Sequence, residues 1–255
     1  MQNRYFTLTC AVIVFGPSII SAALISPTSQ SRTISASADG NYYETPPDPH
    51  PNDCRDSQRA SDSAPDFGPF MSSVSAREVC RGSDATASQT SSILGTQITG
   101  LGAAEGEGKD LFLDGTGSAF AVSSMNVTFL VSEDVTYRFE GQVTAEGIGF
   151  MGPISRAFVR LKGPDDNDVL FLETTTETRA LMTSGTLLAG EYDLEAVADP
   201  GVDFGESSAN FAFDFTVVPE PTNGVFLVLG APVLFAGRRR SRRQNLARCQ
   251  VAKVG

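Results

Sequence analysis

The sequence has no tryptophan, one histidine (His50) and four cysteines among its 255 residues. One imidazole and four scattered thiols do not supply a His/Cys set of zinc-ligand spacing, and a Ser-His-Asp triad would have to use that histidine. Zinc hydrolase and triad mechanisms are therefore excluded, and we expect no cofactor. The lack of tryptophan also counts against a dedicated glycan-binding surface, because sugar rings pack on exposed aromatic faces.

Basic residues are scarce as well: 19 Lys and Arg stand against 30 Asp and Glu, giving a net charge of −11. The charge is unevenly distributed. Residues 24–218 carry 29 acidic and 11 basic side chains, a balance of −18, whereas residues 238–255 carry seven basic side chains and no acidic one. The negative balance argues against a nucleic-acid partner. The segregation of charge indicates that the two segments occupy different electrical surroundings.

The first apolar segment lies near the start of the chain. Arg4 precedes an apolar run from Phe6 to Ile20, and the small residues Ser21-Ala22-Ala23 follow it. This layout is typical of a secretory signal peptide, so we predict that residues 1–23 are removed after Ala23. An uncleaved anchor helix is the alternative, and Pro17 within the run disfavours it.

The second apolar segment, 224–237, lies between Pro219-Glu220-Pro221 and a cluster of arginines. An arginine at mid-bilayer costs about 2.5–3.5 kcal/mol on insertion scales, so the cluster predicts a stop to translocation, with residues 24–218 outside and the tail 244–255 in the cytoplasm. The apolar run would span only about 21 Å as a helix, less than the roughly 30 Å hydrocarbon core, which favours a temporary anchor. The stop-transfer residues are Arg238, Arg239, Arg240, Arg242 and Arg243.

Residues 218–243 together resemble the sorting signal of PEP-CTERM proteins, with Pro219, Glu220 and Pro221 as its signature. The resemblance implies a bacterium that makes extracellular polysaccharide, and cleavage near the motif by exosortase, a membrane transpeptidase. The three residues would then be processing determinants and not catalytic groups. The prolines fix φ near −65° and keep the backbone extended, as a processing enzyme requires. A stiff linker to a tail anchor is the alternative.

The segment 24–90 is predicted to be a disordered acidic leader. From Ser35 to Asp66 it has no Ile, Leu, Val or Met and is rich in Pro, Ser and Asp, so it offers little apolar surface to offset chain entropy. Cys54 and Cys80 are the only cysteines between the signal peptide and the tail. Export to an oxidising compartment favours a disulfide between them, contributing roughly 3 kcal/mol, over two free thiols.

Residues 91–217 show period-2 alternation of apolar side chains, and no stretch has convincing helical periodicity. We therefore predict an all-β fold, an antiparallel jelly-roll-like sandwich, with a turn at Gly163–Asn167. The phrase Leu187–Ala196 resembles a strand approach common in bacterial carbohydrate-binding-like sandwiches, with Gly190 at the entry and Tyr192 and Leu194 facing the core. This resemblance supports the fold and not a ligand.

Asp165, Asp166 and Asp168 are weak candidates for calcium binding, since hard cations take several oxygen ligands. The same residues are typical of a turn between strands, so we expect no metal. The sequence thus predicts an exported, non-catalytic surface or extracellular-matrix protein, held in the membrane by its C-terminal helix until exosortase processes it. A glycan-binding module of the polysaccharide matrix is the alternative, and a secreted hydrolase with unidentified carboxylates is the third candidate.

Overall fold

The computed structural model describes residues 25–42, 54–111, 115–147, 155–201 and 205–218, and every regular element in these ranges is a β-strand. The signal-peptide segment 1–23 and the segment 219–255 lie outside the described residues, so what the sequence predicts for them stays a prediction. The strands are β1 (Ile25–Tyr42), β2 (Cys54–Ser63), β3 (Phe70–Arg77), β4 (Asp84–Leu94), β5 (Gln97–Gly108), β6 (Asp110–Leu111), β7 (Gly115–Val131), β8 (Val135–Gly147), β9 (Ser155–Lys162), β10 (Asp168–Thr174), β11 (Thr178–Leu187), β12 (Gly190–Pro200) and β13 (Gly205–Val218).

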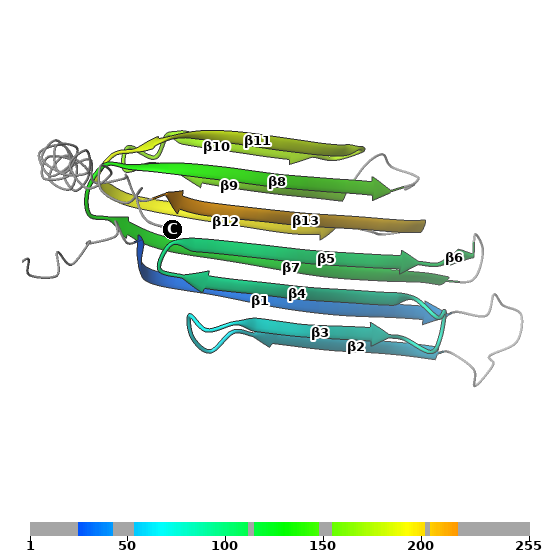
Figure 1. Ribbon diagram of the computed structural model, residues 1–255. Helices are drawn as coiled ribbons and strands as arrows, with labels where there is room; N and C mark the ends of the chain where they lie inside the picture. Colours follow the sequence, from blue (N-terminus) through cyan, green and yellow to red (C-terminus); the bar gives the residue numbers. More distant parts are fainter. Residues whose placement is uncertain (1–24, 43–53, 112–114, 148–154, 202–204, 219–255) are drawn as a thin grey trace, which may run out of the picture. The chain divides into compact units, whose positions relative to one another are not determined.

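The strands form two antiparallel sheets that pack face to face around one hydrophobic core (Figure 1). Sheet A has the strand order β10-β9-β12-β7-β1-β2, with the short β6 also paired to β7. Sheet B has the order β11-β8-β13-β5-β4-β3. The prediction of an all-β antiparallel sandwich is confirmed.

The sandwich is larger than predicted. Strand β1 pairs with β7 along its whole length and, from Thr33 onward, with β2, while β3 and β4 extend sheet B beyond β5. The prediction of a disordered leader over 24–90 is therefore wrong for the strands β1 to β4, and the sandwich begins at Ile25 rather than at residue 91.

Small residues explain both the fold of this region and why the prediction missed it. In β1 the inward Ala36 and Ala38 are buried, while Ser35 and Ser37, which alternate with them, face outward. Alanine and serine alternate with the period of two that a strand requires. The contrast in hydrophobicity between them is slight, so the composition is typical of a disordered segment although the pattern is that of a strand.

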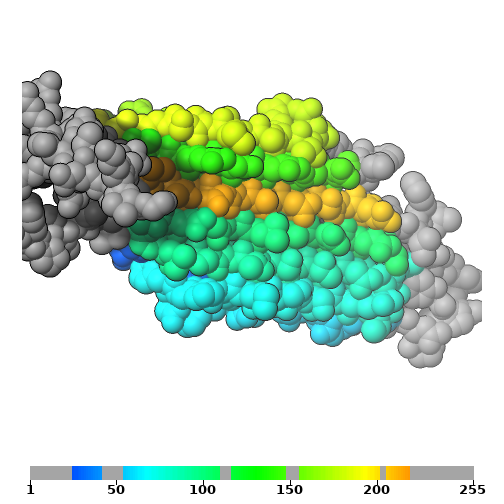
Figure 2. Space-filling model, in the orientation of Figure 1, coloured from blue at the N-terminus to red at the C-terminus, as the bar shows by residue number. Residues whose placement is uncertain are grey.

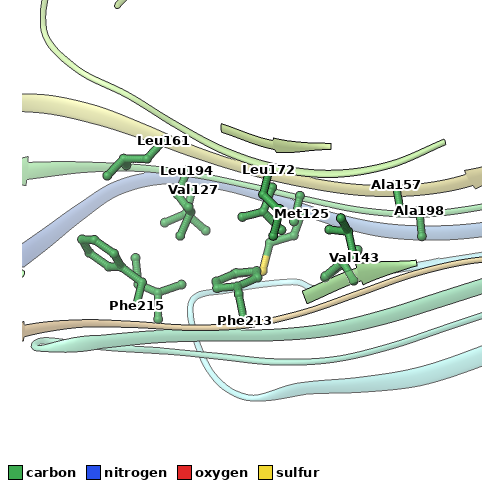
Figure 3. Close-up of a cluster of buried hydrophobic side chains, with 14 of the residues drawn as sticks. Met125, Val127, Val143, Ala157, Leu161, Leu172, Leu194, Ala198, Phe213 and Phe215 are labelled. Atoms are coloured by element: carbon green, nitrogen blue, oxygen red, sulfur yellow. The ribbon is translucent and has the colours of Figure 1, made fainter. Parts of the chain in front are cut away.

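Aromatic side chains fill the interior around β7, β8, β12 and β13. The Phe129 ring lies 5.6 Å from that of Phe215 and 5.7 Å from that of Tyr192. Figure 3 shows Phe215 of sheet B facing Leu161, Leu194 and Val127 of sheet A, and Phe213 of sheet B beside Met125 of sheet A. We call the following buried residues the aromatic core: Phe129, Tyr137, Phe139, Tyr192, Phe211, Phe213 and Phe215.

Alanine and glycine fill the interior between β1, β3, β4, β5 and the first part of β7. A Cβ atom at Gly102 would collide with the Phe211 ring and with Ser123 Oγ, so the close approach of these side chains requires glycine. Strands β1 and β4, from opposite sheets, bring Cα atoms within 8 Å of each other. We call the following buried residues the alanine layer: Ala36, Ala38, Ala76, Ala85, Ala87, Ala104, Ala119 and Ala121.

The first and last described strands reach the same end of the sandwich. The Ile25 amide donates to the Gly95 carbonyl at 3.0 Å, and the Val217 amide donates to the carbonyl of the adjacent Thr96 at 2.8 Å. The chain therefore enters β1 and leaves β13 beside one turn, between β4 and β5.

The loop between β9 and β10 is the predicted turn. The Gly163 amide donates to the Asn167 carbonyl at 2.9 Å, and Asp166 adopts a positive φ of 58°, which aspartate tolerates in turns. Gly190, at the start of β12, has φ 157°, and Tyr192 and Leu194 behind it are buried as expected.

Candidate functional site

The predicted processing motif falls outside the residues that the structure describes. Pro219, Glu220 and Pro221 follow directly after the last described residue, Val218. The same holds for the apolar segment, for the stop-transfer residues Arg238, Arg239, Arg240, Arg242 and Arg243, and for His50. No helix in the described part of the chain is long and apolar enough to cross a membrane.

Cys54 and Cys80 form the predicted disulfide, with their Cα atoms 5.6 Å apart. Cys54 opens β2 of sheet A, and Cys80 follows β3 of sheet B. These two strands form one lateral edge of the sandwich. The bond therefore joins the two sheets covalently where the alanine layer ends.

Glu78 is buried beside the disulfide, and sequence reasoning did not find it. Its carboxylate accepts hydrogen bonds from the Arg81 amide, at 2.9 and 2.8 Å, and from the Ser83 amide at 2.8 Å. A Cβ atom at Gly40 of β1 would collide with this carboxylate. Glu78 thus orders the segment around Cys80 and fixes it against β1.

Two exposed carboxylates of β2 reinforce the same edge. The Val79 amide donates to Asp56 at 3.0 Å, and the Ser72 hydroxyl donates to Asp62 at 2.5 Å. The hydrogen bond from Val79 is the main cause that lowers the pKa of Asp56, and the bond from Ser72 is the main cause for Asp62. Both bonds run from sheet A toward β3 or the residues after it.

Arg32 of β1 is almost fully buried between the sheets, at 1% exposure. Its guanidinium donates to Gln30 Oε1 at 2.9 Å, to Ser91 Oγ at 3.2 Å and to the Asp66 carbonyl, and it lies over the Phe70 ring. Burial lowers the pKa of Arg32, and the charge of Asp66 opposes that shift. The group closes the interior near the loop between β2 and β3, and the sequence offered no signal for it.

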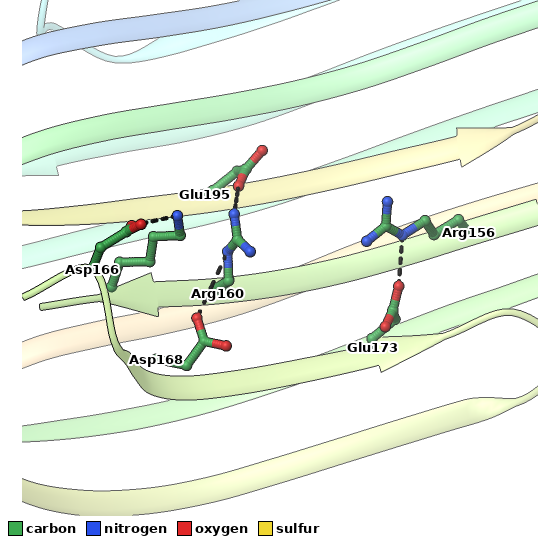
Figure 4. Close-up of polar contacts among 7 residues, drawn as sticks. Arg156, Arg160, Asp166, Asp168, Glu173 and Glu195 are labelled. Atoms are coloured by element: carbon green, nitrogen blue, oxygen red, sulfur yellow. Dashed lines mark hydrogen bonds and ion pairs between the residues drawn. The ribbon is translucent and has the colours of Figure 1, made fainter.

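The calcium candidates lie among cations. Lys162 Nζ donates to Asp166 at 2.5 Å, and Arg160 lies 3.9 Å from Asp168 while its other nitrogen donates to Glu195 at 3.0 Å (Figure 4). The bond from Lys162 is the main cause that lowers the pKa of Asp166.

These pairs form a charge ladder across β10, β9 and β12. Arg156 and Glu173, paired at 2.6 Å, also belong to the charge ladder. Each carboxylate of the ladder faces an arginine or a lysine, and the carboxylates do not converge on a common centre. Asp165 is the remaining calcium candidate. Among the described residues, no group of three or more His, Cys, Asp or Glu side chains could hold a metal ion.

The outer face of sheet B, onto which Figure 2 looks, has two hollows. The first, about 390 Å³, lies where β13 begins and gathers carboxylates from four strands. Lys109 pairs with Glu107 at 3.3 Å and Arg77 with Asp84 at 3.5 Å, which leaves an acidic surface. The carboxylates are Asp84, Glu105, Glu107, Glu146 and Glu206.

The second hollow, about 860 Å³, lies between Leu101 and Met182. Glu140 and Asp214 stand directly opposite each other in it. Glu140 accepts from Arg138 at 3.3 Å and Asp214 from Gln97 at 2.8 Å, so both carboxylates have partners on the sheet.

A third hollow, about 350 Å³, lies on the outer face of sheet A across β7, β1 and β2. Phe120 of β7, 41% exposed, stands on one side and the exposed Arg59 of β2 on the other. Ser37 of β1 pairs with both residues and lies between them, so its short side chain leaves the depression open. The rest of the lining is Ser35, Ala36, Ala60, Ser61 and Val122.

Comparisons with known proteins do not identify the chain. No protein-family model matches it, and no curated protein matches its sequence. The bacteriophage CBA120 tailspike protein 4 enzymatically active domain is 12% identical at a TM-score of 0.21, covering 52% of this chain and 19% of its own. The infectious bursal disease virus VP2 subviral particle is 10% identical at a TM-score of 0.14, covering 79% and 68%. The chain thus spans about a fifth of the tailspike domain, and neither likeness carries an argument on function.

Proposed function

We propose that the chain is an exported, non-catalytic surface or extracellular-matrix protein whose β-sandwich is carried to its destination by the C-terminal signal. In this proposal residues 1–23 direct export, the segment 224–237 holds the protein transiently in the membrane, and an exosortase-type transpeptidase cleaves near Pro219-Glu220-Pro221. The resemblance of 218–243 to the PEP-CTERM signal supports the processing step.

The Cys54–Cys80 disulfide is the observation that carries the proposal of export. Disulfides persist in extracellular and periplasmic compartments and are rare where cellular reductants reach them. The bond joins the start of β2 in sheet A to the segment after β3 of sheet B, so it belongs to the architecture of the sandwich. A protein that depends on such a bond is suited to an oxidising compartment.

The position of the chain ends supports display at a surface. Ile25 and Val217 hydrogen-bond to the adjacent residues Gly95 and Thr96, so the N-terminal and C-terminal segments attach at one end of the sandwich. A protein held through its C-terminal segment would then present the opposite end, where β13 begins, away from the attachment.

We also assign the sandwich to the jelly-roll class. Leaving out β1 to β4 and the two-residue β6, the sheets read β5-β13-β8-β11 and β7-β12-β9-β10. Strands that follow one another in sequence alternate between the sheets except at β9-β10, as in a double Greek key of eight strands. Strands β1 to β4 extend this core at one edge.

Mass spectrometry of the protein isolated from the host cell surface tests the processing step. We expect an intact mass that starts after Ala23 and lacks the arginine cluster, with Cys54 and Cys80 resistant to thiol labelling without reductant. The variant Glu220→Ala should retain the tail and stay in the membrane fraction, while Glu191→Ala, an exposed carboxylate on β12, should be processed normally. A surface form that keeps residues 238–243 would overturn the processing proposal.

A further inference from the structure

The cations of the sandwich are not all compensated. Arg77, Lys109, Arg138, Arg156, Arg160, Lys162 and Arg179 each have a carboxylate partner. In the described part of the chain, the side chains of Arg55 and Arg59 have no ion-pair or hydrogen-bond partner. Both lie exposed on β2, four residues apart, so their guanidinium groups project from the same face of sheet A.

Two uncompensated arginines are unusual in a segment that carries 29 acidic and 11 basic residues. An exposed guanidinium is a planar donor that matches a carboxylate with two parallel hydrogen bonds. Arg59 also lines the hollow that contains Phe120, so an anion-binding group and an exposed aromatic face share one depression.

The hollow has the chemistry of a sugar site. The Phe120 ring offers a π-face on which the C–H face of a pyranose packs. Ser35, Ser37 and Ser61 supply hydroxyls that both donate and accept hydrogen bonds. Ser37 of β1 forms the bottom of the hollow. Phe120 on β7 and Arg59 on β2 stand on either side of it, two strand spacings or about 10 Å apart. Arg59 adds recognition of a carboxylate on the ring.

We propose that the hollow between Phe120 and Arg59 binds an acidic polysaccharide of the uronate class. One pyranose ring packs on Phe120, its carboxylate pairs with Arg59, and its hydroxyls contact the serines. Arg55 lies about 13 Å farther along β2, at 3.3 Å per residue, where it meets a second carboxylate of the same chain. The ligand is therefore a polymer rather than a single sugar.

The acidic hollow of sheet B disfavours this ligand, so the polymer binds on the outer face of sheet A. The acidic hollow of sheet B carries Glu105, Glu146 and Glu206, so an anionic chain is repelled there. Nucleic acid is disfavoured even at the Arg55–Arg59 site. A DNA duplex carries about one phosphate per 1.7 Å, so the negatively charged sandwich repels it more strongly than it repels a polyuronate. Asp39, on β1 between the rows of the two arginines, limits affinity without pairing to either.

The test is titration of the full chain in detergent with polygalacturonate, measured by calorimetry at low salt. Arg59→Gln and Phe120→Ala should each weaken binding about tenfold, Arg55→Gln less, and Asp39→Asn should strengthen it severalfold. Arg138→Gln, an exposed arginine of sheet B, is the matched control and should leave affinity unchanged. All five positions are solvent-accessible on strands, and an unchanged unfolding midpoint shows that each variant is folded.

Neutral dextran and double-stranded DNA are the comparison ligands. Dextran should bind at least tenfold more weakly than polygalacturonate, and DNA should not compete with it. Equal binding of dextran, effective competition by DNA, or unaltered affinity in Arg59→Gln and Phe120→Ala would each overturn the proposal. Binding does not depend on C-terminal processing, so its failure leaves the proposed export standing, and the reverse also holds.

Discussion

The aromatic core and the alanine layer belong to one sandwich, yet they are stabilised in different ways. A fully buried phenylalanine contributes about 1.5–3 kcal/mol of apolar transfer, whereas a buried methylene-sized group contributes about 0.8 kcal/mol. Ordering the backbone costs about 1–2 kcal/mol per residue in either region. Strands lined with alanine and glycine therefore recover less of that cost than strands lined with phenylalanine.

Covalent and polar contacts make up the difference at the edge of the alanine layer. The Cys54–Cys80 bond and the hydrogen bonds to Asp56 and Asp62 join β2 to β3 or to the segment after β3. The buried Glu78 carboxylate orders that segment and holds it against β1. The opposite edge, formed by β10 and β11, lies next to the aromatic core and has no disulfide among the described residues. Burial of large apolar side chains thus stabilises the aromatic core, whereas the disulfide and hydrogen bonds along the β2–β3 edge, which we call the rim, stabilise the alanine layer.

The largest effect should come from truncation within the aromatic core. Phe215 is fully buried and packs against Phe129 and Tyr137. Phe215→Ala should lower the free energy of unfolding by about 3–5 kcal/mol, because the side chain leaves a cavity that cannot collapse. Urea titration followed by circular dichroism measures this. Phe171→Ala, 45% exposed on β10, is the control and should cost under about 1 kcal/mol. Equal effects would show that burial does not distinguish the two positions.

Removal of the disulfide should come next and should act on the alanine layer. The double variant Cys54→Ser/Cys80→Ser should lose roughly 3 kcal/mol through the greater entropy of the unfolded chain. Hydrogen exchange should show weaker protection in β1 to β4 and little change in β12 and β13. Uniform loss of protection across the sandwich would mean that the two regions unfold as one unit and that the comparison fails.

A smaller effect should come from adding volume where the alanine layer meets the aromatic core. The added methyl of Gly102→Ala would meet the Phe211 ring and Ser123 Oγ, so we expect a loss of about 1–3 kcal/mol from overpacking. Ala103→Ser changes the neighbouring residue, whose side chain lies on the outer face of β5, and should be nearly neutral. Thermal unfolding of both variants tests this, and an unchanged unfolding midpoint in Gly102→Ala would show that the boundary between the two regions has room for a methyl group.

Hydrophobic contrast decides how much of this fold the sequence predicts. Phe211-Ala212-Phe213-Asp214-Phe215 alternates large apolar and small or polar residues, and its inward positions are those the alternation predicts. In β1 the same period is present with alanine against serine. A methyl group differs too little from a hydroxymethyl group for a single sequence to distinguish a strand from a disordered segment.

The sequence predicts those parts of the site that depend on neighbouring residues or for which only one partner is available. Cys54 and Cys80 were the only cysteines available to each other, and the turn at Gly163–Asn167 depends on neighbouring residues. The buried position of Glu78 depends on Gly40 of β1, which is distant in the sequence and leaves room for the carboxylate. The hollow at Phe120 and Arg59 needs β7, β1 and β2 side by side, a placement that only the strand order supplies.

The smallest expected effect is that of acidic pH, which should destabilise the rim of the alanine layer before the aromatic core. Hydrogen bonds hold the pKa of Asp56 and of Asp62 below their ordinary value of 3.8. A carboxyl group whose folded-state pKa is depressed stabilises the protein above its unfolded-state pKa, and this contribution disappears as the pH falls through the folded-state value. The rim of the alanine layer should therefore loosen below about pH 4, while the aromatic core includes no carboxylate.

Hydrogen exchange at a series of acidic pH values, corrected for the intrinsic rate, tests this difference. Amides of β2 and β3 should lose protection before those of β13 as the pH falls. In the double variant Asp56→Asn/Asp62→Asn the rim should be slightly weaker at neutral pH and its protection should vary less with pH, because an amide side chain does not titrate. The double variant Glu191→Gln/Asp193→Asn, at two exposed residues of β12, controls for the loss of two negative charges. If the double variant kept the full acid response, other carboxyl groups would have to cause it, and the two aspartates would not contribute to it.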